Sequence, residues 1–191
     1  MSYHIYQTEG IILSKRDVGE ADRIFSILTK DLGRIDAMAQ GARYLKSKLR
    51  YNLNAFDYCR FGLVATRDFW RIIDAEELNS WPTLRASFDK LAALSRIAAL
   101  INRMVKGQEP DFYLWNEVKN TFAFLEKNGI LKDENGKGLE AFELLTTLKI
   151  LSLLGYVADA EKWVNLPLDE AQKIKPLMVS IINKALQESQ L

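Results

Sequence analysis

Residues 40–50 form a short basic run that could bind phosphate groups. They read Q-G-A-R-Y-L-K-S-K-L-R, with four Lys or Arg in eleven positions, a tyrosine among them and no acid. Cations at this density attract a polyanion, because each phosphate that they neutralise releases counterions. A basic loop is also common as a solvated turn. The run therefore predicts a phosphate-binding loop only if the elements around it suit one.

Residue types that could do catalysis are few and scattered. The single histidine, His4, lies near the terminus, where a surface position is expected. Cys59 lies in a β-rich run and is expected to be a small buried hydrophobe. Glu20 and Asp22 could act as an acid and base pair, although a turn with a local ion pair to Arg23 is the better interpretation. No nucleophile motif, phosphate-binding glycine loop or metal spacing occurs. We therefore expect no enzyme activity and no metal site.

The composition excludes several classes of protein. Hydrophobic residues make up 48% of the 191 residues and charged residues 27%, which is typical of a soluble globular protein. The formal net charge is +1, so any attraction for a polyanion must be local. One cysteine excludes a disulfide framework and a cysteine-rich zinc site within this chain. We expect no cofactor, no secretory signal, no membrane helix and a cytoplasmic location.

The first part of the chain has the pattern of a small β-barrel. Residues 24–29 are apolar on both faces of a strand, which is typical of a closed barrel rather than an open sheet. Glycine-containing turns separate short β-rich runs. We predict a five-stranded OB-fold barrel, and periodicity alone leaves an SH3-like barrel open. The expected strands are residues 8–14, 23–29, 34–39, 56–65 and 69–75.

From Ser80 onward the apolar residues recur at helical spacing, which predicts an α-helical second domain. Ser80 is a candidate N-cap ahead of Pro82, and Gly155 is a candidate helix end. Pro176 is expected to kink or interrupt the last helix. The fold class is therefore α+β, with domains at residues 1–79 and 80–191. The expected helices are residues 91–105, 111–127, 139–154 and 168–188, with a polar loop at 128–138.

The cations concentrate within the predicted barrel. Residues 34–71 carry eight Lys or Arg and three Asp. On OB barrels, nucleic acid lies across strands 2 and 3 and the loops beside them, with cations on phosphates and aromatic rings on bases. Four aromatic residues border these cations: Tyr44, Tyr51, Phe69 and Trp70. Phe69 and Trp70 could instead belong to the core. The pattern favours nucleic-acid binding.

Several segments occur in an informative order. The first segment reads Y-Q-T-E-G-I-I-L-S-K-R-D-V-G-E-A-D-R-I-F-S-I-L-T. It is followed by G-R-I-D-A-M-A-Q-G-A-R and then by S-K-L-R. Later come A-E-E-L-N-S-W-P-T-L-R and F-E-L-L-T-T-L-K-I-L-S-L-L-G-Y. Together these segments, from Tyr6 to Tyr156, resemble the bacterial recombination mediator family RecO.

The resemblance implies an OB-fold domain followed by a helical domain. It also implies binding of single- and double-stranded DNA, annealing of complementary strands, and help in loading recombinase. The implied partners are RecR and the acidic C-terminal tail of the single-strand DNA-binding protein. After Tyr156 the chain lacks the four-cysteine zinc module of many family members, so we expect a reduced helical domain without zinc. That departure makes contact with the tail less certain than DNA contact by the barrel.

Charge and resemblance together select the expected DNA-binding residues. Arg43 lies in the matched G-A-R element, and Arg16 and Arg23 lie in the first matched segment. Gly41 is expected to adopt a backbone conformation that a β-carbon would oppose. Tyr44 is a candidate for stacking on a base. The expected phosphate-binding residues are Arg34, Arg43, Lys46, Lys48 and Arg50.

Other interpretations stay open at this point. Arg16 and Arg23 could pair with the neighbouring acids Asp17, Glu20 or Asp22 instead of DNA. The near-neutral charge and the missing zinc module also suit a protein-interaction scaffold of the repair machinery with little DNA affinity. An enzyme acting on nucleic acid is the weakest alternative, because no nucleophile or metal-binding carboxylate cluster is evident.

Overall fold

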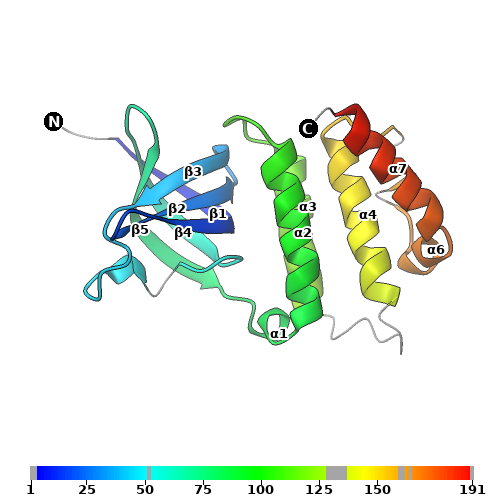
Figure 1. Cartoon of the computed structure of the whole chain (residues 1–191), viewed down its shortest axis with the longest axis horizontal. Helices are drawn as coiled ribbons and strands as arrows, with labels where there is room; N and C mark the ends of the chain where they lie inside the picture. The colour runs from blue at the N-terminus through cyan, green and yellow to red at the C-terminus, as the bar shows by residue number, and fades with distance from the viewer. Residues whose placement is uncertain (1–3, 51–52, 128–136, 159–161, 164, 190–191) are drawn as a thin grey trace. The chain divides into compact units, whose positions relative to one another are not determined.

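Five strands form along the first part of the chain, and each contributes apolar side chains to one core. The computed structural model describes residues 4–50, 53–127, 137–158, 162–163 and 165–189, and Figure 1 shows its strands and helices. The strands are β1 (Ile5–Val18), β2 (Asp22–Thr29), β3 (Gly33–Ala39), β4 (Tyr58–Ala65) and β5 (Trp70–Asn79).

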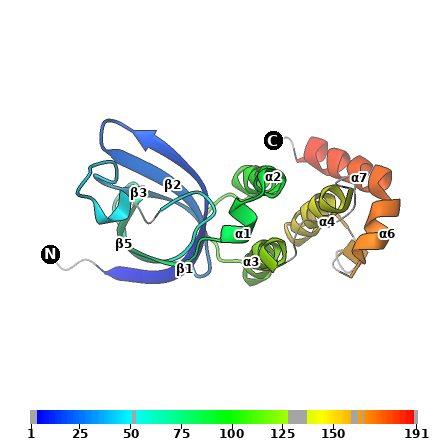
Figure 2. The same cartoon turned by 90° about the horizontal axis from the view of Figure 1, so that it is seen from below.

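The strands close into a barrel in the order β1-β2-β3-β5-β4, and Figure 2 looks into the ring of strands. β3 and β5 pair in parallel, through Ala37 with Trp70 and Met38 with Arg71, and the other neighbours pair antiparallel. This arrangement confirms the predicted five-stranded OB-fold barrel, and helices follow it in the chain.

Two strands are longer than the sequence pattern predicted. β1 continues through the polar stretch after Ser14, where Asp17 pairs with Arg23 of β2 in the ladder. β5 continues to Asn79, which pairs with Tyr58 of β4. The added positions are mostly exposed, so they accept charged side chains that carry no hydrophobic signal. Both strands are longer than predicted because the added residues pair with the neighbouring strand.

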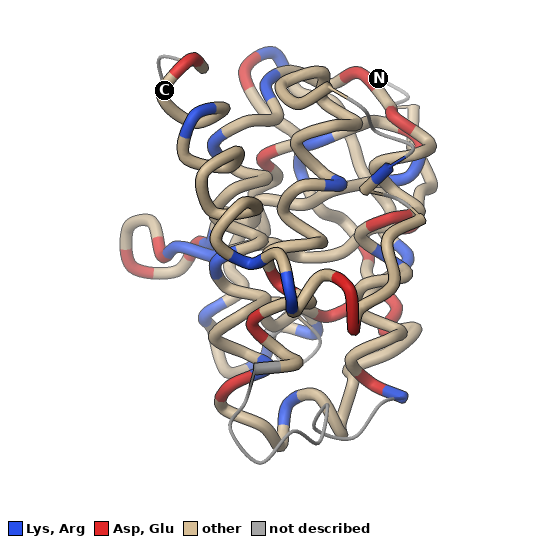
Figure 3. Tube along the Cα trace, turned by 90° about the vertical axis from the view of Figure 1, so that its right-hand side faces the viewer, with Lys and Arg blue, Asp and Glu red and all other residues tan. Residues whose placement is uncertain are grey.

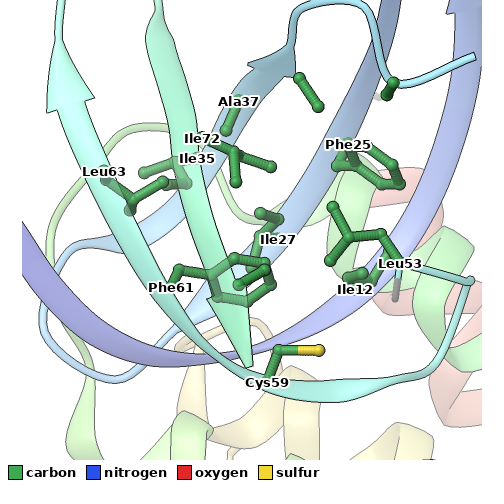
Figure 4. Close-up of a cluster of buried hydrophobic side chains, with 13 residues drawn as sticks. Ile12, Phe25, Ile27, Ile35, Ala37, Leu53, Cys59, Phe61, Leu63 and Ile72 are labelled. Atoms are coloured by element: carbon green, nitrogen blue, oxygen red, sulfur yellow. The ribbon is translucent and has the colours of Figure 1, made fainter. Parts of the chain in front are cut away.

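The barrel interior is filled by side chains from all five strands, and Figure 4 shows them pointing toward one another. Phe25 and Ile27 of β2 and Phe61 of β4 are fully buried. Burying each such side chain stabilises the fold by about 1.5–3 kcal/mol. The expectation that β2 is buried on both faces is confirmed, because every residue from Phe25 to Thr29 is buried.

Helices occupy most of the chain after the barrel strands. The longest ones have an apolar stripe or an apolar surface all round. None of the helices in the described part is long and apolar enough to cross a lipid bilayer. The helices are α1 (Pro82–Arg85), α2 (Phe88–Met104), α3 (Phe112–Lys127), α4 (Lys137–Leu153), α6 (Leu168–Lys173) and α7 (Lys175–Glu188).

The helix ends correct two sequence predictions and agree with two others. Ser80 does not cap the first helix, because Trp81 is the N-cap residue of α1, in a left-handed conformation and without a side-chain cap. The last helix is interrupted near Pro176, as expected, and forms two helices, with Pro176 in the first turn of α7, where its missing N–H costs no hydrogen bond. α4 starts at Lys137, inside the predicted loop, whose residues 128–136 lie outside the described part. Gly155 ends α4 with a φ of 80°, as predicted.

The chain divides into two compact units. One unit is Met1–Ser80 with Lys106–Trp115, and the other is Trp81–Val105 with Asn116–Leu191. Within the second unit, α4 packs against α2, α6 and α7. Its core includes Leu148, Leu151 and Met178.

Segment 106–115 belongs to the barrel unit, although it lies between two helices of the chain. The indole Nε1 of Trp70 donates a 2.8 Å hydrogen bond to Oε1 of Gln108. A β-carbon on Gly33 would lie 2.4 Å from the carbonyl oxygen of Glu109. The rings of Tyr58 and Trp115 are 6.2 Å apart. These contacts attach the segment to the barrel at separate points.

Candidate nucleic-acid interface

The basic run at residues 40–50 follows β3 and forms consecutive tight turns. The backbone N–H of Tyr44 donates to the carbonyl oxygen of Gly41 at 3.0 Å, and the N–H of Ser47 donates to that of Tyr44 at 3.0 Å. Gly41 has a φ of 63°, a left-handed conformation that side chains oppose. The backbone conformation expected for Gly41 is therefore present.

The base of this loop is attached to the turn between β1 and β2. The N–H of Gly41 donates to Oδ1 of Asp22 at 2.8 Å. Arg43 donates twice, from its backbone N–H to the carbonyl oxygen of Ala21 and from Nη1 to that of Gly19, both at 2.9 Å. The hydrogen bonds of Gly41 and Arg43 hold residues 41–43 in place, so the rest of the loop extends from a fixed base.

Asp17 on β1 joins two of the predicted DNA-binding arginines. Its Oδ1 accepts a 2.7 Å hydrogen bond from Nε of Arg23, and its Oδ2 lies 3.5 Å from Nε of Arg43. The hydrogen bond from Arg23 and the charges of Arg23 and Arg43 outweigh partial burial and lower the pKa of Asp17. Of the two alternatives for Arg23, the structure contains the ion pair. Of the three acids named from the sequence as partners for Arg23, the structure pairs it with Asp17.

Four side chains beyond this base are exposed. Lys46 and Lys48 extend from the loop and make no ion pair within the described part of the chain. Tyr44 is 63% exposed and Leu45 is 76% exposed. Arg50 lies in the short 3-10 helix η1 (Lys48–Arg50), and its side chain lies outside what the structure describes, as does Tyr51.

The other predicted cations lie on strands. Arg34 on β3 is bound to Oδ1 of Asp36 at 2.9 Å, and its side chain is 20% exposed. Arg16 on β1 is exposed, and the ladder aligns it with Ile24, Met38 and Arg71 across four strands. Ile24, Met38 and Arg71 each lie next to a residue of the barrel core in their strand, so the row faces outward.

Arg71 at the end of this row was not selected from the sequence as a site residue. Its Nε is buried without a hydrogen-bond partner in the described structure, and its Nη1 lies 3.5 Å from Oε1 of Gln40. The signal that could have found it is pairing between β3 and β5, which joins segments far apart in the sequence. Strand register is not visible in a local charge pattern.

The two other candidate aromatic residues, Phe69 and Trp70, differ in how far their rings are exposed. Trp70 packs on the barrel core and contacts the ring of Tyr6 edge-on at 5.1 Å between centroids. Phe69 is 38% exposed, in the turn that joins β4 and β5. Of the two, Phe69 is therefore the ring that a ligand could reach.

The groups considered for catalysis are not brought together. His4 is exposed, as expected. Cys59 is fully buried in β4, as expected, and burial together with the nearby Asp57 and Glu77 raises the pKa of its thiol to about 12. Asp22 accepts the hydrogen bond from the Gly41 backbone. Within the described residues, no cluster of three or more His, Cys, Asp or Glu side chains could hold a metal ion.

Charge is mixed over the chain as a whole. The net charge is +1, and Figure 3 shows Lys and Arg interspersed with Asp and Glu along the trace. The exposed cations of the loop are thus a local feature. A closed OB barrel that presents such a loop, followed in the chain by helices, defines the class of protein to which this chain belongs: an OB-fold protein with a helical domain.

Comparison with known proteins identifies the family. Residues 1–81 match the family described as Recombination protein O N terminal. The DNA repair protein RecO of Gloeothece citriformis is 37% identical over 122 residues, which are 64% of this chain and 43% of that protein. The RecO of Pelotomaculum thermopropionicum is 30% identical over 159 residues, 83% of this chain and 58% of that protein. That of a Roseiflexus species is 31% identical over 157 residues, 82% and 52% respectively.

The chain belongs to the RecO family, and the resemblance seen in the sequence is confirmed. It spans about half the length of these relatives.

Proposed function

We propose that this protein is a non-enzymatic DNA-binding protein of recombinational repair. In this proposal it binds single- and double-stranded DNA, anneals complementary strands, and helps to load recombinase together with RecR. The observation that carries the proposal is the fixed basic loop on an OB barrel, with Lys46 and Lys48 exposed and without an acidic partner in the described structure. The names of the relatives, DNA repair protein RecO, support the same role.

The proposal divides the work between the two predicted domains. Residues 1–79 bind DNA, and the helices of residues 80–191 contact other proteins, apart from segment 106–115, which belongs to the barrel unit. The acidic C-terminal tail of the single-strand DNA-binding protein is the partner proposed for the helical domain, beside RecR.

The loop cations have different proposed roles because their surroundings differ. Lys46 and Lys48 are exposed and bind phosphates directly, with Arg50 as a third contact. Arg43 shares Asp17 with Arg23, so both arginines mainly hold the loop and add to its positive field. The outlying strand residues Arg16 and Arg34 extend the positive surface beyond the loop.

The test is fluorescence anisotropy of a labelled single-stranded oligonucleotide over a series of salt concentrations. The logarithm of the binding constant falls with that of salt by roughly 0.7 for each phosphate contact on a single strand. With three direct contacts from the loop, the wild type should therefore give a slope of about −2 or steeper. Arg43/Lys46/Lys48/Arg50→Ala should lose most of this slope and most of the affinity.

A matched control removes the same charge elsewhere. Arg103, Lys127, Lys173 and Lys184 are exposed residues of the helices, and replacing these four by alanine should leave the slope unchanged. If the two quadruple variants bind DNA equally well, the loop does not hold the DNA.

A scaffold without DNA affinity is the alternative function, and the near-neutral net charge favours it. It predicts that wild type shows no salt-dependent binding to any oligonucleotide. It also predicts that RecR is captured at a salt concentration high enough to suppress DNA binding. Incubation of labelled oligonucleotide with magnesium tests for nuclease activity, and we expect the oligonucleotide to stay intact.

A further inference from the structure

The outer part of the basic loop carries two large apolar side chains in contact with water. Tyr44 is 63% exposed and Leu45 is 76% exposed, and both lie between Arg43 and Lys46 in the sequence. Exposing these side chains forgoes the stability that burial would supply. Phosphate binding by itself requires only cations, so it does not explain an apolar pair at this place.

The ring of Tyr44 is held in position before any ligand binds. A β-carbon on Gly41 would lie 3.2 Å from Cδ2 of Tyr44, so the ring lies against the glycine backbone. The backbone of Tyr44 makes hydrogen bonds to Gly41 and Ser47, and the loop base is fixed to Asp22 and Ala21. A ring that is already placed loses little conformational entropy on binding.

The chemistry of the loop selects a ligand that is both anionic and apolar. Single-stranded nucleic acid has this character, because its bases expose π-faces while its backbone carries one phosphate per nucleotide. The bases of a continuous duplex are stacked inside it, and its outer surface offers phosphates first. An apolar pair flanked by cations therefore fits unpaired bases better than paired ones.

We propose that Tyr44 and Leu45 form a base-contacting tip that makes the loop prefer single strands to duplex. The ring of Tyr44 stacks on an unpaired base, Leu45 packs beside it, and Lys46 and Lys48 bind the adjoining phosphates. This inference rests on the proposed DNA-binding function and adds the strand preference to it.

An anionic membrane surface also combines negative charge with apolar groups, but it fits the loop less well. Binding to a bilayer interface grows with the apolar area that is inserted, and amphipathic helices provide a whole face for it. The tip offers two side chains in a series of turns rather than a helix.

The experiment compares the wild-type 191-residue chain with Tyr44→Ala/Leu45→Ala. Anisotropy is measured with a single strand and with a duplex of equal length at several salt concentrations. Stacking is worth about 1–3 kcal/mol for each base, so single-strand affinity should fall about 5- to 150-fold. Duplex affinity should change less than twofold. The salt slope should stay the same, because no phosphate contact is removed.

A spectroscopic measurement tests stacking directly. The fluorescence of 2-aminopurine in the single strand should change on binding wild type and Tyr44→Phe, which keeps the ring. It should change much less with Tyr44→Ala. Phe112→Ala/Tyr113→Ala is the matched control, because these aromatic residues of α3 are 63% and 73% exposed and lie outside the loop.

The outcomes separate this inference from the proposed function. Wild type that binds neither strand form contradicts the proposed function and the inference with it. Equal loss of single-strand and duplex affinity in the double-alanine variant, or no loss of either, overturns the inference alone. Sedimentation with phosphatidylserine vesicles that needs Tyr44 and Leu45, with DNA binding unchanged, also overturns it and assigns the tip to a lipid surface. Far-UV circular dichroism confirms that each variant is folded.

Discussion

Asp17 changes the roles that the sequence suggests for its neighbours. Arg23 and Arg43 are both candidates for phosphate binding by charge, but each lies against this one carboxylate. Surface ion pairs are worth little to stability, so their main effect here is on position. Arg23 lowers the pKa of Asp17 below its ordinary value of 3.8, so the carboxylate keeps its charge to a lower pH than a free aspartate does. The two ion pairs are lost only as the pH falls through this lowered pKa.

Two constraints favour glycine at position 33, a left-handed backbone conformation and the close approach of another segment. Substitutions can separate the two. Its φ is 65°, and an added β-carbon would lie 2.4 Å from the carbonyl oxygen of Glu109. Gly19 has a similar φ of 57° but no atom within 4 Å of that position. Gly19→Ala should therefore cost about 1–2 kcal/mol of unfolding free energy from backbone strain alone.

Gly33→Ala should cost clearly more, because segment 106–115 must also move away. Urea denaturation of the two variants beside wild type measures the difference. Equal losses in the two variants would mean that segment 106–115 moves aside freely.

At the scale of elements, α1 depends on a side chain from another helix. α1 has no side-chain N-cap of its own. Glu126 of α3 accepts hydrogen bonds from the backbone N–H groups of Thr83 at 3.1 Å and Leu84 at 2.9 Å. Burial acts to raise the pKa of Glu126, and these hydrogen bonds outweigh it, so the pKa lies below 4.5.

Glu126→Ala should lower the free energy of unfolding by about 1–2 kcal/mol at pH 7, the usual cost of losing a helix cap. A depressed carboxyl pKa stabilises the fold above its unfolded value and loses that effect as the pH falls through the folded value. The difference between wild type and variant should therefore shrink below pH 4.5. Urea denaturation at pH 7 and pH 3.5 checks this.

Glu188→Ala on α7 is the control, because its ion pair with Lys184 is exposed. A Glu126→Ala variant no less stable than this control would show that α1 needs no such cap.

The elements differ in how far the sequence could predict them. Periodicity placed the five strands, because burial of residues such as Phe25 and Ile27 repeats along a strand. It ended β1 too early, because the extension to Val18 is held by pairing rather than by apolar side chains. Likewise the basic loop was visible as a run of charge. The attachment of the loop to Asp22 and Gly19 was not visible in the sequence. These two contacts join residues that are separated by 19 and by 24 positions along the chain.

At the scale of the whole molecule, the barrel unit is discontinuous in sequence. It includes Lys106–Trp115 beside the strands that end before Ser80. A fragment of residues 1–80 should therefore melt at a lower temperature than one of residues 1–115. It loses the hydrogen bond between Trp70 and Gln108 and the packing of segment 106–115 on Gly33.

Thermal denaturation of the two fragments, followed by far-UV circular dichroism, measures this effect. Hydrogen exchange of β2 and β3 in each fragment locates it within the barrel. Equal melting temperatures and equal protection would show that the strands are sufficient by themselves.

The same discontinuity sets an order of events during synthesis on the ribosome. When Ser80 has been added, the last strand is complete, but the segment that ends at Trp115 is 35 residues away. At roughly 5–20 residues per second, synthesis of that stretch takes about 2–7 s. For this interval the nascent barrel lacks the segment that packs on Gly33. Molecular chaperones that bind nascent chains therefore have a defined period in which to act on this barrel.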